Sequence, residues 1–97
     1  MIAIIKSSTF DAWLGGLRDR AGRARTLVRI DRLAAGNPGD HKGLGNGLSE
    51  MRITFGPGYR VYYTARGPFL IVLLAGGDKS TQVGDIVKAK IIAAEWE

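Results

Sequence analysis

The sequence has 97 residues, of which 45% are hydrophobic and 24% charged, and this predicts one globular domain over residues 1–97. Lys and Arg number 14 against 9 Asp and Glu, a formal net charge of +5 that favours an acidic or phosphate-rich partner. The chain has no cysteine and one histidine, which excludes disulfides and thiolate metal sites, and we expect neither a metal nor a cofactor. The opening residues MIAIIK are too short for a membrane span and lack the features of a signal peptide, so we expect a cytoplasmic protein without membrane contact.

The first third of the chain predicts one strand and two helices. Residues 2–5 form a short apolar run that is typical of a strand buried on both faces. Ser8 and Asp11 resemble a capping box, and four apolar residues then follow at helical spacing: Phe10, Trp13, Leu14 and Leu17. A second helix is expected from about residue 19 or 20 to Ala35, where the Gly-Asn-Pro-Gly segment 36–39 stops it.

The second helix has two different sides. Its apolar side is predicted to contain Ala24, Leu27, Ile30 and Ala34. The opposite side carries a stripe of arginines: Arg25, Arg29 and Arg32. This arginine stripe is either the solvated face of the helix or a track for RNA phosphates or an acidic partner.

Residues 36–47 are rich in Gly, Asn and Pro and predict a loop, which carries His41 and Lys42. Three alternating segments follow, separated by turn signals at residues 56–58 and 65–68, and they predict an antiparallel meander. Because side chains alternate along a strand, Arg52, Arg60 and Tyr62 should project from the face opposite the apolar set. A basic face with an aromatic residue is a surface for a polyanion.

The last third of the chain predicts a central strand and a helix. The strand, residues 69–74, is apolar at every position, as expected when both faces are covered. Gly76 and Gly77 then predict a sharp turn into a helix at about residues 81–96, whose first N–H groups could bind an anion. Besides its buried side, this helix has a second apolar stripe that is either buried or contacts a protein partner: Val87, Ile91 and Ala94.

Five segments, in this order, carry a family resemblance: Phe10-x-x-Trp13-Leu14-x-x-Leu17-x-Asp19, Arg29-Ile30-x-Arg32-Leu33-x-x-Gly36-Asn37-x-Gly39-Asp40, Gly47-Leu48-x-Glu50-Met51-Arg52-Ile53, Gly56-Pro57-Gly58-Tyr59-Arg60-Val61-Tyr62-Tyr63 and Leu73-Leu74-x-Gly76-Gly77-Asp78-Lys79-x-x-Gln82. Together they resemble the RelE/ParE superfamily of type II toxin–antitoxin toxins, in particular the phage-derived addiction module killer proteins of the HigB-like group. The resemblance implies an α+β fold in which two N-terminal helices pack on a mostly antiparallel four-stranded sheet with a C-terminal helix.

The resemblance also implies a metal-independent endoribonuclease that cleaves mRNA, commonly on the ribosome, through attack of a ribose 2′-OH on the adjacent phosphate. Arg52 and Arg60 would stabilise phosphate charge, and Tyr62 would stack on a base or hydrogen-bond the ribose. Lys79 completes the implied catalytic set, and the implied RNA-binding set adds two residues, Lys42 and Gln82. The proton acceptor stays open among Glu50, Asp78 and His41, and Arg52 could instead pair with Glu50 or Asp78.

The partner implied by the resemblance is a small helix-turn-helix antitoxin that forms a hetero-oligomer with the toxin. The residues best suited to bind it are the arginine stripe and the exposed side of the last helix: Arg25, Arg29, Arg32, Val87 and Ile91. Two alternatives remain. One is a toxin that binds DNA gyrase and cleaves no nucleic acid, and the other is an inactive phage-derived module that only binds its partner.

Overall fold

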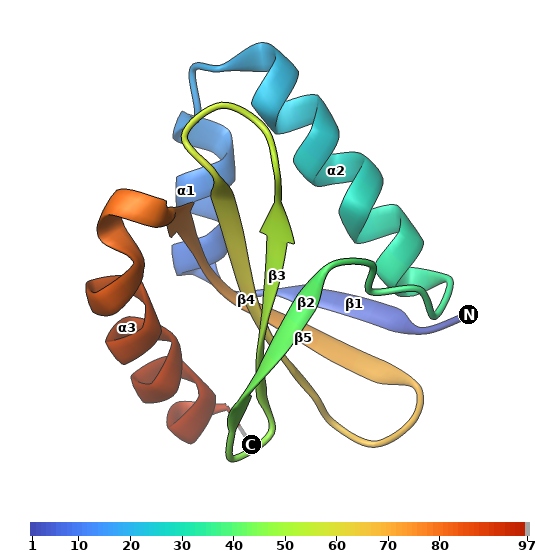
Figure 1. The fold of residues 1–97 in the computed structure, drawn as a ribbon. Coiled ribbons are helices and arrows are strands. Elements are labelled where there is room, and N and C mark those ends of the chain that lie inside the picture. The colour runs from blue at the N-terminus through green and yellow to red at the C-terminus, as the bar shows by residue number, and fades with distance from the viewer. Residues whose placement is uncertain (97) are drawn as a thin grey trace.

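The computed structural model describes residues 1–96, and the last residue of the predicted domain, Glu97, lies outside this range. The described residues form five strands, three α-helices and one short 3-10 helix (Figure 1): β1 (Ala3–Lys6), α1 (Ser8–Gly16), α2 (Arg20–Ala34), β2 (His41–Gly45), β3 (Leu48–Ile53), β4 (Tyr59–Ala65), β5 (Leu70–Asp78), η1 (Lys79–Thr81) and α3 (Gln82–Glu95). The strands make one sheet in the order β1-β5-β4-β3-β2. Helices α1 and α2 cover one face of this sheet, and α3 covers the other.

The predicted α+β class is confirmed, but the sheet is larger than expected and mixed. Strand β1 runs parallel to β5, with Ala3 opposite Leu70, whereas the other pairs are antiparallel. The additional strand is β2, which lies inside the segment 36–47 that was expected to be a loop. The glycines at positions 45 and 47 serve the turn after the strand, because their φ values are +90° and +77°. Asn46 between them also has a positive φ, +53°.

Strand β1 was predicted to be buried on both faces, and this is wrong. It lies at the edge of the sheet, and its residue Ile5 is 38% exposed. A short apolar run fits an edge strand as well as a central one, since an edge strand still buries one face. Strand β5 lies inside the sheet between β1 and β4, and its residues 71–75 are all buried.

Both N-terminal helices begin at a polar cap. The Ser7 hydroxyl accepts a hydrogen bond from the Phe10 N–H at 3.0 Å and donates one to the Leu74 carbonyl at 2.6 Å, so it caps α1 and ties it to β5. Helix α1 therefore starts one residue after its cap at Ser7, rather than at a capping box begun by Ser8. In α2, Asp19 takes the cap position and accepts from the Gly22 N–H at 3.0 Å.

The buried side of α2 differs from the predicted one. Its buried residues are Gly22, Thr26, Ile30 and Leu33, whereas Leu27 is 39% exposed. The reason is a close approach between α2 and β4, because a Cβ atom on Gly22 would lie 2.3 Å from Cε2 of Tyr59. The helix rotates its smallest residue toward the aromatic ring, and the apolar residues at positions 24 and 27 turn outward.

Two apolar layers hold the fold together. The layer under α1 and α2 contains Phe10, Leu14, Ile30, Leu33 and the inward residues of β3, β4 and β5. The layer under α3 is smaller and is built from Leu48, Tyr62, Val72, Leu74, Ala75 and Ala89. Among residues 1–96, no helix has the length and apolar character needed to cross a membrane.

Gly76 and Gly77 were expected to make a turn into the last helix, yet both lie within β5. A Cβ on Gly76 would meet the Trp13 ring at 2.2 Å, and one on Gly77 would meet Oδ2 of Asp85 at 1.8 Å. Each glycine therefore lets a helix approach one face of the strand closely. The start of η1 is capped by Asp78, which accepts from the Ser80 N–H at 2.8 Å, so this carboxylate already occupies the predicted anion position.

Candidate functional site

The register of β2, β3 and β4 brings the predicted basic residues onto one face. Arg52 is the cross-strand partner of Arg60, and Glu50 is the partner of Tyr62 on one side and Lys42 on the other. Cross-strand partners share a face of the sheet. The face is the one that α3 partly covers, so these residues lie beside the first turn of that helix, as the alternation predicted for Arg52, Arg60 and Tyr62.

Glu50 is the centre of this group. Its side chain is fully buried, and its Oε1 atom lies 3.0 Å from Nε of Arg52 and 3.8 Å from Nε of Arg60. The second oxygen, Oε2, accepts a hydrogen bond of 2.8 Å from Nε2 of Gln82 at the start of α3. The side chains of Arg52 and Arg60 are 33% and 14% exposed, so both reach from this buried carboxylate toward solvent. The four residues Glu50, Arg52, Arg60 and Gln82 are called the Glu50 cluster below.

The carboxylate of Glu50 is held in its charged form. Burial raises its pKa, but the hydrogen bonds from Gln82 and Arg52 and the charges of Arg60 and Arg52 outweigh burial and lower the pKa below the ordinary value of 4.5. Two guanidiniums share this one carboxylate. The cluster therefore keeps excess positive charge, which is the requirement for an anion site.

Tyr62 occupies a different place from the one expected of a base-stacking residue. Its side chain lies in the layer under α3 and has an exposure of 0%, so no base can stack on its ring in this conformation. Its hydroxyl is buried and has no hydrogen-bond partner among residues 1–96. Burial and the charges of Glu50 and Asp85 raise the pKa of Tyr62, so its hydroxyl stays protonated at neutral pH.

The two predicted lysines lie at the borders of the cluster. Lys42 is exposed on the edge strand β2, directly opposite Glu50. Lys79 is exposed in η1 and lies beside the turn between β3 and β4, where a Cβ on Gly58 would be 3.6 Å from its own Cβ. Gln82 contacts the cluster directly through Glu50. Five of the six predicted RNA-binding residues thus reach the surface, and four of them contact Glu50 or lie opposite it in the sheet: Lys42, Arg52, Arg60 and Gln82.

Only one of the three candidate proton acceptors lies beside the arginines. His41 is the cross-strand partner of Met51, which places it on the opposite face, and its ring contacts the Gly39 carbonyl. Asp78 pairs with Tyr59 in register and serves as the cap of η1. Glu50 remains, but both of its oxygens are already engaged by donors. The open alternative that Arg52 pairs with Glu50 is the one the structure contains.

The arginine stripe of α2 is not uniform. Arg29 is half-buried and donates to the carbonyls of Arg52 at 2.5 Å, Pro38 at 2.9 Å and Asp40 at 3.1 Å. Its guanidinium therefore connects α2 to β3 and to the loop that precedes β2. The guanidinium of Arg25 lies 4.3 Å from the ring centre of Phe55, and these arginines and Arg32 border a hollow of about 340 Å³.

The outer side of α3 is apolar and exposed. Val83, Val87 and Ile91, at a spacing of four residues, are 82%, 55% and 58% exposed. The second apolar stripe of the sequence thus faces outward at Val87 and Ile91. The other side of the helix packs Ile86, Ala89 and Ala93 onto the sheet.

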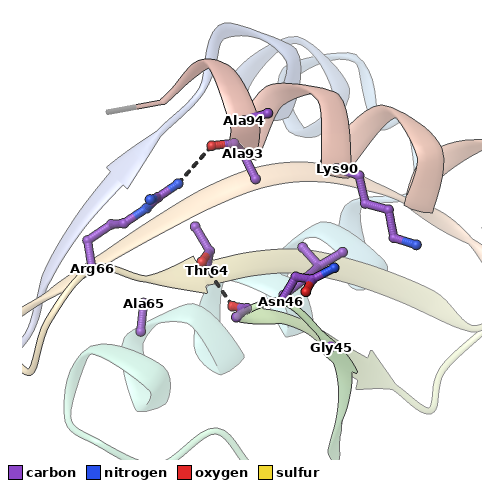
Figure 2. A pocket seen from close by; sticks show the side chains of 10 residues that line it. Gly45, Asn46, Thr64, Ala65, Arg66, Lys90, Ala93 and Ala94 are labelled. Atoms are coloured by element: carbon purple, nitrogen blue, oxygen red, sulfur yellow. Dashed lines mark hydrogen bonds between the residues drawn. The ribbon is translucent and has the colours of Figure 1, made fainter.

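A separate hollow of about 460 Å³ lies at the other end of the sheet, between the turn at Asn46 and the last turn of α3 (Figure 2). Arg66 donates to the Ala93 carbonyl at 2.7 Å and fastens the end of α3 to β4. Thr64 donates to the Gly47 carbonyl at 2.9 Å and holds the turn between β2 and β3. The residues that line this hollow thus hold the end of α3 and the turn between β2 and β3 in place.

The position of Glu50 could have been found by extending the alternation of β3 back by one pair of residues, since Glu50 and Arg52 then share a face. No pattern in the sequence predicted the contact between Thr81 and Asp85. The Thr81 hydroxyl donates to Oδ2 of Asp85 at 2.5 Å, and this pair packs on Gly77. The residues that the structure describes bring together no group of three His, Cys, Asp or Glu side chains suited to a metal ion.

The fold and the cluster define an α+β protein with a basic, partly covered sheet face. No family model matches the chain. It is 47% identical over 94 residues to an uncharacterized protein of Haemophilus influenzae, a match that spans 97% of this chain and 95% of that protein. The chain therefore belongs to the same protein family as this Haemophilus protein.

Proposed function

We propose that this chain is a RelE/ParE-like toxin of a type II toxin–antitoxin module and acts as a metal-independent endoribonuclease on mRNA at the ribosome. The observation that supports this most directly is the pair of guanidiniums, Arg52 and Arg60, directly opposite each other on one sheet face. Arginine binds phosphate oxygens through two parallel hydrogen bonds, and two arginines side by side match the oxygens of one phosphodiester.

The proposed reaction needs stabilisation of phosphate charge above all. The ribose 2′-oxygen forms a bond to phosphorus, the bond from phosphorus to the 5′-oxygen breaks, and one proton moves from the 2′-hydroxyl to solvent while another reaches the leaving oxygen. Negative charge builds up on the non-bridging oxygens in the transition state, where Arg52 and Arg60 would lie. Lys42 and Lys79 would contact neighbouring phosphates of the strand. The products are a 2′,3′-cyclic phosphate and a 5′-hydroxyl.

Tyr62 is left out of this proposal because its ring is buried. Without a stacked base, the cluster would recognise the backbone of the RNA, and any base preference would come from the ribosome. Glu50 is in the correct charged form for a proton acceptor, but its oxygens are occupied by Arg52 and Gln82. Charge stabilisation and orientation therefore carry the proposed catalysis.

The test combines growth and RNA mapping. Expression from a tight promoter should stop growth and create new mRNA 5′ ends that carry hydroxyls. Purified protein that is treated with EDTA and then freed of it should still cleave mRNA on ribosomes in a buffer with Mg²⁺ as the sole divalent metal. The double variant R52A/R60A should lose both effects. The matched control R20A/R23A removes the same charge from two exposed residues of α2 and should remain active. Growth arrest with intact mRNA would refute the ribonuclease, and DNA damage signalling in its place would indicate a gyrase-binding toxin.

We also propose that the antitoxin binds the exposed side of α3, where Val83, Val87 and Ile91 form an apolar strip. A small helix-turn-helix protein encoded by the adjacent gene is the proposed partner. The variant V87E/I91E should abolish capture of this partner and leave folding unchanged. The control F69E changes an apolar residue that is even more exposed, 74% in the turn between β4 and β5, and should bind normally. Normal binding by V87E/I91E would refute this surface.

A further inference from the structure

Glu50 is an unusual residue to bury in the centre of a sheet face. Its side chain is 0% exposed, and it makes contacts with charged or polar atoms of Arg52, Arg60 and Gln82. Buried ion pairs are often no more stabilising than apolar residues of the same volume, because removing charges from water is costly. Stability alone therefore gives no reason for a carboxylate at this position.

The direction of the contacts gives a reason. Both arginines approach the same oxygen, Oε1, and both approach it with Nε. Among residues 1–96, the hydrogen bond from Nε to Glu50 is the only one made by the Arg52 side chain. The Nη groups of Arg52 and Arg60, which form the fork that recognises phosphate, are thus left for an external ligand.

Arg60 depends on Glu50 in particular. Its Nε is buried and has no hydrogen-bond partner among residues 1–96, and the Glu50 carboxylate at 3.8 Å is the anion in reach. Gln82 completes the arrangement, because its bond to Oε2 fixes the carboxylate from the side of α3. One carboxylate that is itself held in place therefore orients Arg52 through a hydrogen bond and keeps Arg60 beside it through charge.

We propose that Glu50 is a positioning residue that holds Arg52 by a hydrogen bond to Nε and attracts Arg60 by charge, and so presents the Nη groups of both arginines as a paired clamp for one phosphodiester. This inference rests on the proposed function, since it assigns a role within the same RNA site. Glu50 acts through the arginines and does not touch the RNA. Its negative charge lies beside a site for a negative ligand, and the benefit of fixed geometry exceeds the cost of that repulsion.

Charge and geometry predict opposite results for the variant E50Q, which makes the inference testable. Removal of a negative charge near the site should tighten RNA binding if only electrostatics matter. Loss of positioning should weaken it, and we expect E50Q to bind a 2′-O-methyl RNA oligonucleotide about tenfold more weakly than the wild type at fixed salt. The control E95Q has the same charge change at an exposed residue of α3 and should bind as tightly as the wild type or slightly more tightly. Fluorescence anisotropy measures all three.

A second variant covers the case in which E50Q fails to fold. R52K keeps the charge at a partly exposed position, but a single ammonium cannot contact Glu50 and present a fork to phosphate together. We expect about a tenfold loss of affinity for the same oligonucleotide. In ¹⁵N NMR spectra, the Nε–H signal of Arg52 should be protected from exchange in the wild type and E95Q and lose this protection in E50Q. RNA binding by E50Q or R52K that equals or exceeds that of the wild type would overturn the proposal.

The proposed function fails in a different way. If wild-type protein and R52A/R60A bind RNA equally, the cluster is not an RNA site. The role of Glu50 is then decided with inorganic pyrophosphate as the probe and the arginine Nε–H signals as the readout. Pyrophosphate binding that E50Q weakens and E95Q leaves unchanged supports the positioning role, and equal binding by both variants refutes it.

Discussion

Two tyrosines of β4 predict opposite consequences for the same chemical change. Tyr59 and Tyr62 are both buried, with exposures of 5% and 0%. The Tyr59 hydroxyl donates to Oδ2 of Asp19 at 2.7 Å, whereas the Tyr62 hydroxyl has no partner within residues 1–96. Replacement by phenylalanine removes one oxygen in each case. Y62F should stabilise the protein, and Y59F should destabilise it.

The expected gain for Y62F follows from the cost of a buried, unpaired hydroxyl, which is about 1–3 kcal/mol. Part of the gain is lost to the small void left by the oxygen, so we expect about 1 kcal/mol in the free energy of unfolding. For a domain of this size, that raises the melting temperature by about 4–8 °C. RNA binding should be unchanged, because the ring of Tyr62 lies under α3 and the oxygen does not reach the surface.

Urea unfolding followed by circular dichroism gives the stability, and anisotropy with the RNA oligonucleotide gives the binding. The reasoning fails if Y62F is less stable than the wild type, because the hydroxyl would then have a partner in Glu50, whose charge and hydrogen bonding add to burial in raising the pKa of Tyr62. It also fails if Y62F folds normally but loses RNA binding. That result would restore Tyr62 to the site and require α3 to move during binding.

Three further predictions concern packing and pH. G22A should be destabilised by about 1–3 kcal/mol through overlap with the Tyr59 ring, whereas G84A, which has open space around it, should gain about 1 kcal/mol; urea unfolding of both checks this. The lowered pKa of Glu50 gives stability that is present above pH 4.5 and lost as the pH falls through the folded value, so melting temperatures between pH 3 and 6 should fall more in the wild type than in E50Q. The hydrogen bond to Asp19 raises the pKa of Tyr59 from 10.0 to about 12, so its contribution is present below pH 10 and lost toward pH 12, and Y59F should flatten this alkaline loss in the same assay.

Alternation and helical spacing were sufficient to predict most elements of the fold. The meander, both N-terminal helices and the apolar central strand follow from local patterns, and the structure contains all of them. The errors arise where one composition fits two structures. Glycines in the segment 36–47 indicated a loop, but a five-residue strand fits before the turn. Gly76 and Gly77 indicated a turn, but they make room for Trp13 and Asp85, which no local pattern reveals.

In the candidate site, too, local patterns predicted some features, whereas contacts between distant segments were not predicted. The alternation of side chains along a strand placed Arg52 and Arg60 on one face, and the register of β3 and β4 confirms this. The same rule placed Tyr62 there correctly but could not show that α3 covers it, because the docking of a helix on a sheet depends on residues far along the chain, such as Ala89 in the same apolar layer. The contact from Gln82 to Glu50 joins residues 32 positions apart and is likewise invisible to spacing.

Helix α3 gives the cluster its particular chemistry. It covers Tyr62 and supplies Gln82 to Glu50, and its approach depends on Gly77, where a Cβ would collide with Asp85. A carboxylate flanked by two arginines on an open sheet face would be hydrated, and the arginines would sample many orientations. Beside the first turn of α3 the same carboxylate is buried, charged and hydrogen-bonded by Gln82. The first turn of α3 therefore fixes, through the neutral side chain of Gln82, the carboxylate that lies beside both arginines.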